Sequence, residues 1–132
     1  MKVQKKETAP RYVREDGITS YLLASPITTE SRYLTTSLVV IQPGGYQRIH
    51  NHEPEQIYFI LEGSGEMTVG DETLSVSPGD CIFIPSGALH GLNNVGESQL
   101  RYFSAASPSF TREELTSFWP SGSETESQPE AT

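Results

Sequence analysis

The chain has 132 residues, which is enough for one domain with a buried core but too few for two. A hydrophobic fraction of 35% and a charged fraction of 20% are typical of a globular protein and argue against a disordered or membrane-embedded chain. The formal net charge of -8 repels phosphate backbones and no basic stripe offsets it, which excludes nucleic acid as an expected partner.

Residues 1–30 form an N-terminal segment that we expect to be partly flexible and to pack on the rest of the chain or on a second copy. Its opening, MKVQKKETAP, has lysines but no apolar stretch behind them, and no run approaches the roughly 20 apolar residues that cross a bilayer. A single cysteine, Cys81, can form no internal disulfide, which is typical of a reducing compartment. We therefore expect a cytoplasmic protein without a membrane partner.

Residues 31–107 have the pattern of a β protein. Short apolar or alternating runs recur there, each bounded by Gly, Pro, Asn, Asp or a short polar stretch: YLTTSLVVIQ, QIYFILE, GEMTV, ETLSV, CIFI and QLRYFS. The clearest hairpin is MTVGDETL, in which two alternating runs join through Gly70-Asp71. Seven or eight short strands without a long helical pattern predict an all-β sandwich or barrel of the jelly-roll type.

Residues 108–120 predict one short C-terminal helix. Thr111 and Glu114 have the spacing of a capping box, and a proline directly after Trp119 ends the run. One face of this helix would dock on the barrel through Leu115, Phe118 and Trp119. Residues 121–132, SGSETESQPEAT, are polar and acidic and predict a disordered tail.

Two of the three histidines stand two residues apart in RIHNHEPEQ. On an extended strand alternate side chains point the same way, so Arg48, His50 and His52 would share one face. By itself a His-x-His pair is more often chance, or part of a solvated face, than a metal site. The surrounding residues therefore decide the interpretation.

The wider spacing around the histidines is specific. Five residues separate Gly44 from His50, then three separate His52 from Gln56 and six separate Gln56 from Gly63. The second stretch is GDCIFIPSGALHGLNN. In it, five residues separate Gly79 from Pro85, and one separates Pro85 from Gly87. Two residues then separate Gly87 from His90, and three separate His90 from Asn94. These stretches resemble the two sequence motifs of the cupin family. The second motif matches fully, and the first departs where the family usually has Glu and this chain has Gln56.

The resemblance implies a double-stranded β-helix, the cupin barrel, with six to eight strands and one divalent transition metal per chain inside it. Carried over residue by residue, it implies the metal ligands His50, His52, Gln56 and His90. Imidazole suits Fe, Mn, Ni or Zn, so the metal among these stays open.

Glu55 is the rival of Gln56 as the fourth ligand. A carboxylate binds a metal ion more strongly than an amide does. Glu55, however, is the residue next to Gln56, so its side chain should point to the opposite face unless the strand bulges near Pro54. We expect Glu53 to be a solvated loop charge. An amide in place of a carboxylate leaves a divalent ion its full charge, and it removes a candidate general base.

Two further residues are candidate catalytic groups. If Gln56 points inward, Tyr58 does too, and it could donate a proton or simply pack in the wall. Arg48 could clamp an anionic substrate through two parallel hydrogen bonds, or be a charge at the rim. We expect Cys81, which stands among apolar neighbours in DCIFI, to fill the core.

The other face of the same strand carries Ile57, Phe59 and Leu61, which must be covered by the N-terminal segment or by a second subunit. The resemblance implies a homodimer. It also implies a metal-dependent enzyme for a small carbonyl, phenolic or carboxylate compound, with an oxygenase favoured over an isomerase or lyase of sugar acids. The alternatives are a non-catalytic module that binds a small ligand and a remnant with an empty site, because this fold hosts many functions.

Overall fold

The computed structural model describes residues 1–119. This part of the chain forms a short 3-10 helix at Lys6–Thr8, ten strands and one α-helix. The strands are β1 Arg11–Arg14, β2 Ile18–Leu22, β3 Thr35–Ile41, β4 Tyr46–His50, β5 Glu55–Glu62, β6 Gly65–Val69, β7 Glu72–Val76, β8 Cys81–Ile84, β9 His90–Asn93 and β10 Leu100–Ser107, and the helix is α1 Arg112–Phe118.

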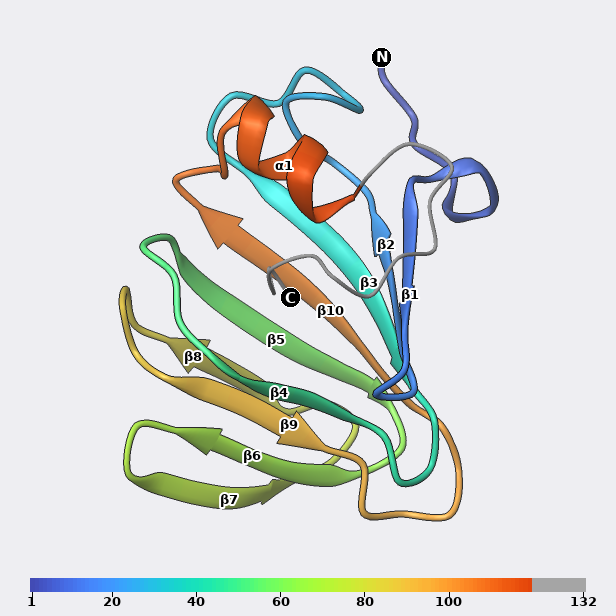
Figure 1. The fold of residues 1–132 in the computed structure, drawn as a ribbon, viewed down its shortest axis with the longest axis vertical. Helices are drawn as coiled ribbons and strands as arrows, with labels where there is room; N and C mark the ends of the chain where they lie inside the picture. Colours follow the sequence, from blue (N-terminus) through green and yellow to red (C-terminus); the bar gives the residue numbers. More distant parts are fainter. Residues whose placement is uncertain (120–132) are drawn as a thin grey trace.

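Two antiparallel sheets make up the body of the protein (Figure 1). The six-stranded sheet has the order β1-β2-β3-β10-β5-β8, and the four-stranded sheet has the order β4-β9-β6-β7. Both contribute to one core, in which Ile60 and Tyr102 of the larger sheet lie with Met67 and Leu92 of the smaller one. The prediction of an all-β jelly-roll barrel with a short C-terminal helix is confirmed.

The hairpin predicted from MTVGDETL is present. Val69 of β6 pairs with Glu72 of β7, so Gly70 and Asp71 form a two-residue loop, and Gly70 has a φ of +59°. Glycine adopts this left-handed conformation without steric cost, which is why the loop closes tightly.

The N-terminal segment contains a hairpin that the sequence analysis did not predict. β1 and β2 pair with each other, and β2 pairs with β3, so they extend the six-stranded sheet. With these two strands the described residues contain ten strands, whereas the sequence predicted seven or eight. Residues 11–22 are therefore part of the barrel wall, and they do not cover the outer face of β5, because β3 and β10 lie between.

The C-terminal helix begins as predicted. The Thr111 hydroxyl accepts a hydrogen bond from the Glu114 amide at 3.1 Å, and the Glu114 carboxylate accepts one from the Thr111 amide at 2.9 Å. Leu115 and Trp119 are buried in a second core cluster with residues of β1, β2 and β10, and the Trp119 indole donates to the Ser20 carbonyl. The predicted tail, residues 121–132, lies outside the described residues.

Strand β5 alternates as predicted. Gln56, Tyr58 and Ile60 point inward and are buried. On the outer face Phe59 is 37% exposed and Leu61 42% exposed. The described residues include no helix with the length and apolar character needed to cross a membrane.

The expectation for Cys81 was wrong, because its side chain is exposed. Cys81 pairs with Phe59 across the β5-β8 ladder, and cross-strand partners point to the same face of a sheet. It therefore lies with Phe59 on the outside of the barrel. Apolar neighbours in the sequence do not show which face of a strand a residue occupies.

Candidate metal centre

The three histidines come together between the two sheets. His50 ends β4 and pairs with His90, the first residue of β9, while His52 lies in the loop that leads to β5. The ring centroids of His50 and His90 are 4.2 Å apart, and that of His52 is 5.0 Å from His90. One ring nitrogen from each histidine lies within 4.8 Å of the others. This arrangement can bind a metal ion.

Backbone carbonyl groups hold all three rings in the same way. Each Nδ1 lies 2.9 to 3.0 Å from a carbonyl oxygen two residues away, and the acceptors are those of Arg48, Pro54 and Ala88 for His50, His52 and His90 in turn. A neutral ring can make this bond only by donating its Nδ1–H, so the lone pair stays on Nε2. The same contact orients metal-binding histidines and fixes their tautomer.

Because each Nδ1 is bonded to a carbonyl group, the Nε2 atom of each ring keeps the lone pair with which it could bind a metal ion. Those of His50 and His90 are buried and have no hydrogen-bond partner within residues 1–119. A buried ring nitrogen without a partner is costly, because nothing replaces the hydrogen bond that it would make with water. A cation shared by the rings satisfies both nitrogens at once.

Gln56 completes the site from β5. Its Oε1 lies 2.9 Å from Nε2 of His52, and its Nε2 donates to the Ser104 hydroxyl at 2.6 Å. Because Nδ1 of His52 carries the proton, two acceptors face each other here. A cation between the two lone pairs, or the opposite orientation of the amide, satisfies both. The rival Glu55 is exposed on the other face of the strand, as the alternation predicted.

Burial keeps the rings neutral. Burial, then the neighbouring His90, lowers the pKa of His50 to about 3, and burial lowers the pKa of His90 to about 4. The pKa of His52 is also lowered, chiefly by burial. A histidine must be neutral to bind a metal, so the rings are ready to bind at pH 7 without releasing protons. Three imidazole nitrogens and one amide oxygen fit a divalent transition metal such as Fe, Mn, Ni or Zn.

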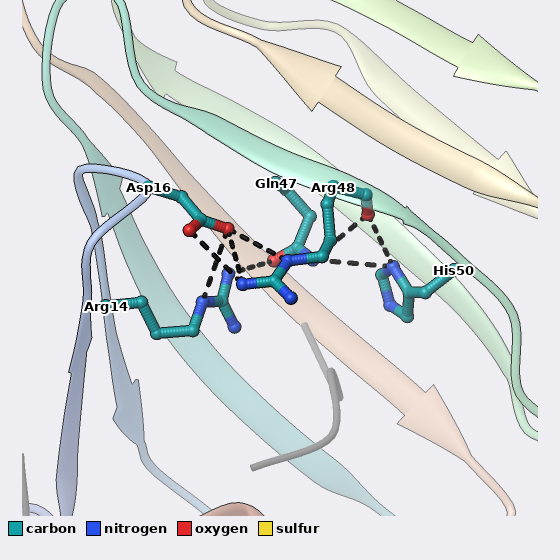
Figure 2. Close-up of polar contacts among 5 residues, drawn as sticks. All are labelled: Arg14, Asp16, Gln47, Arg48 and His50. Atoms are coloured by element: carbon teal, nitrogen blue, oxygen red, sulfur yellow. Dashed lines mark hydrogen bonds and ion pairs between the residues drawn. The ribbon is translucent and has the colours of Figure 1, made fainter. Parts of the chain in front are cut away.

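Arg48 does not share the face of His50, which corrects the sequence analysis. The β4-β9 register shifts between Gln47 and His50, so the alternation breaks there and Gln47 is buried in place of Arg48. Gly91 of β9 permits the close approach, since a β-carbon there would lie 3.0 Å from the Gln47 carbonyl oxygen. The Arg48 side chain is 48% exposed and donates to both carboxylate oxygens of Asp16 (Figure 2).

Tyr58 lies inside the barrel, as predicted. It is fully buried, its ring stacks on Tyr102 at 4.1 Å between centroids, and its centroid is 5.9 Å from that of His90. Tyr58 therefore belongs to the wall beside the histidines. Its use as a proton donor stays a prediction.

Sequence reasoning missed two residues at this site. Arg14, at the end of β1, is buried and donates from Nη2 to Oε1 of Gln47 at 3.1 Å. Phe110, which precedes α1, packs edge-on against His52 at 5.3 Å between ring centroids. The signal for Arg14 was present in RYVREDGITSYL, where an Asp-Gly pair separates two alternating runs and predicts a hairpin.

Comparison with known proteins agrees with the fold. The family profile of the cupin domain matches residues 37–106. An uncharacterized protein of Methanocaldococcus jannaschii is 30% identical over 104 residues, which are 78% of this chain and 83% of the relative. The 5-nitrosalicylic acid 1,2-dioxygenase of a Bradyrhizobium species is 30% identical over 64% of this chain and 42% of its own length. The solved structure of the polyketide cyclase RemF from Streptomyces resistomycificus superposes with a TM-score of 0.69 at 28% identity, over 81% of this chain and 79% of that one.

Proposed function

This chain belongs to the cupin family, and from that premise we propose that it is a metal-dependent enzyme acting on a small carbonyl, phenolic or carboxylate compound. The observation that carries the proposal is the common orientation of the three rings. Each has its Nδ1 tied to the backbone, and the Nε2 atoms of His50 and His90 are buried without a partner in the described chain. We propose His50, His52, His90 and Gln56 as the ligands.

A divalent ion held by these ligands would polarise an oxygen atom of the substrate or of water and, if it is iron, would support reaction with O2. The protein adds a neutral ligand set, so the full charge of the ion acts on the substrate. It also adds apolar walls, since Phe110 packs on His52 and Tyr58 lies beside His90. Such walls limit the access of water and strengthen electrostatic interactions inside the site.

Within this class we favour an oxygenase. A histidine-rich site in which four protein ligands leave coordination positions open suits iron that reacts with O2. The likeness to 5-nitrosalicylic acid 1,2-dioxygenase supports this choice, because that relative is named for a dioxygenase reaction.

A non-redox reaction is the second candidate, as in an isomerase or lyase of sugar acids. Gln56 supports it, because an amide oxygen keeps the charge on the ion high and favours polarisation of a substrate carbonyl. The similarity to a protein named as a polyketide cyclase also supports a non-redox reaction, because that name describes a cyclisation and not an oxidation.

Oxygen uptake by the protein loaded with Fe(II) and with Zn(II) tests the two candidates. The substrates are a panel of 1,3-diketones, salicylates, catechols and unsaturated sugar acids, with His90→Ala as the control variant. Uptake of O2 with product formation by the iron form alone supports the oxygenase, and product without uptake supports the isomerase or lyase. Saturable binding without product contradicts an enzymatic function and favours a binding module.

We also propose that a second copy of the chain covers the outer face of β5 and β8. Phe59 and Leu61 lie there beside Phe83, which is 56% exposed. Large apolar side chains grouped on one face are typical of an interface. A twofold pairing would let the same face of each copy cover the other and would give a homodimer.

A further inference from the structure

Strand pairing positions two of the three histidines of the metal centre, but not His52. His50 ends β4 and pairs with His90 at the start of β9, so the β4-β9 ladder holds those two rings close together. His52 lies in the connection between β4 and β5, outside both strands. A ligand on a connection is held less precisely than one on a strand, unless other contacts fix the connection. The contacts of residues 51–54 therefore determine where the ring of His52 lies.

The connection that carries His52 lies against the connection that leads into β9. The first comprises residues 51–54, between β4 and β5, and the second comprises residues 85–89, between β8 and β9. Both are at the same end of the barrel (Figure 1). Each also supplies a carbonyl group that orients a ring, because Nδ1 of His52 donates within the first and Nδ1 of His90 donates within the second. Contacts between the two connections therefore set the position of one ring relative to the other.

Three hydrogen bonds join the two connections. The Gly87 amide donates to the His52 carbonyl at 2.9 Å, and the Gly87 carbonyl accepts from Nδ2 of Asn51 at 3.2 Å. The Ser86 hydroxyl donates to the Glu53 carbonyl. We call these three bonds the clasp. Two of them depend on side chains, which are those of Asn51 and Ser86.

Both side chains are exposed, which indicates how their loss would act. Removal of an exposed polar side chain leaves no cavity and no buried group unpaired, so the fold should tolerate it. Residues 51–54 lie outside the strand ladders, so without the clasp this connection can loosen locally. A metal ion must then order the loosened ligand when it binds, and this ordering lowers the affinity.

We propose that Asn51 and Ser86 are positioning residues of the metal centre, which through the clasp hold the ring of His52 at 5.0 Å from that of His90. The inference rests on the proposed metal centre but not on the reaction assigned to it. Both residues act through His52, and neither is proposed as a ligand. The clasp therefore contributes to metal affinity and not to the stability of the metal-free fold.

Equilibrium dialysis of the full chain against Zn(II) tests the proposal. Asn51→Ala and Ser86→Ala should each lower the affinity about 3- to 10-fold, the range expected for one hydrogen bond, and the double variant should lower it about 10- to 100-fold. Ser86→Thr, which keeps the hydroxyl, should bind zinc as tightly as wild type. In the metal-free proteins the midpoint of urea unfolding should stay close to that of wild type.

Gln99→Ala is the matched control, because it removes one exposed amide hydrogen bond, to Glu62 at 3.1 Å, at the opposite end of β5. Its affinity for zinc should equal that of wild type. A second comparison shows whether Asn51 acts through His52. In a His52→Ala background Asn51→Ala should change the affinity no further, because the ring that it positions is absent.

The proposal is overturned if Asn51→Ala and Ser86→Ala bind zinc as tightly as wild type, or if Ser86→Thr binds as weakly as Ser86→Ala. It is also overturned if Asn51→Ala lowers the affinity equally in the absence of His52. A wild type that takes up no zinc overturns the metal centre and this proposal together. Zinc binding with the expected losses, but without turnover of any substrate, supports the clasp and contradicts only the enzymatic function.

Discussion

The lowered pKa values of His50 and His90 predict that the metal-free protein loses stability as the pH falls below 6.5. His50 has a pKa of about 3 and His90 a pKa of about 4 in the folded chain, against about 6.5 in an unfolded one. Because the folded values are lowered, the unfolded chain binds more protons in this window. The contribution to stability is complete above pH 6.5 and is lost as the pH falls towards 4 and then 3.

The size of the effect follows from the same values. For each histidine that stays neutral in the folded chain, the free energy of unfolding falls by about 1.4 kcal/mol per pH unit below 6.5. Between pH 8 and pH 5 this is about 2 kcal/mol for His50 and a similar amount for His90, or roughly 4 kcal/mol together. That is a large part of the about 5–15 kcal/mol that stabilises an ordinary domain.

Urea unfolding in the presence of a chelator, at pH 8 and at pH 5, measures the loss. The reference is the double variant His50→Gln/His90→Gln, which cannot titrate at these positions. Carboxylates contribute equally to both proteins and cancel in the comparison. The free energy of unfolding of wild type should fall by roughly 4 kcal/mol more than that of the double variant. Equal losses in the two proteins would refute the claim that the fold holds these rings neutral.

Three further predictions concern the fourth ligand, the helix and the outer face. Gln56→Ala should lower the affinity for Zn(II) about 10- to 100-fold in equilibrium dialysis, while Glu55→Ala on the opposite face should not change it; equal effects would contradict the ligand assignment. Leu115→Ala should lower the free energy of unfolding by about 2–5 kcal/mol in urea, since this side chain is fully buried, and a loss below about 1 kcal/mol would contradict the docking of α1. Phe59→Glu should convert a dimer to a monomer in light scattering because it places a charge in the apolar face, and a monomeric wild type would contradict the proposed pairing.

The motif spacing predicted which residues would meet, because the spacing encodes strand geometry. His50, His52, Gln56 and His90 converge, although about 40 residues lie between the first and the last. Alternation placed Gln56 and Tyr58 inside, since period-two patterns hold along an unbroken strand.

The same rule failed at Arg48, because a bulge depends on packing that no local pattern shows. The β4 strand shifts register where it lies against Gly91, a contact between residues far apart in sequence. Cys81 was misplaced for a related reason, since its face is set by its pairing with Phe59. Arg14 was missed because a polar residue on an edge hairpin appears solvated until the tertiary fold closes over it.

The most direct test of the metal centre is the stoichiometry of Co(II) binding to the purified wild type and to His90→Ala, followed by the d–d absorption of the bound ion. One Co(II) per wild-type chain, with a spectrum that His90→Ala abolishes, is the predicted result. Failure of wild type to bind Co(II), Ni(II), Zn(II), Fe(II) or Mn(II) would contradict the account. So would binding that survives the loss of His90, since the ion would then be held elsewhere.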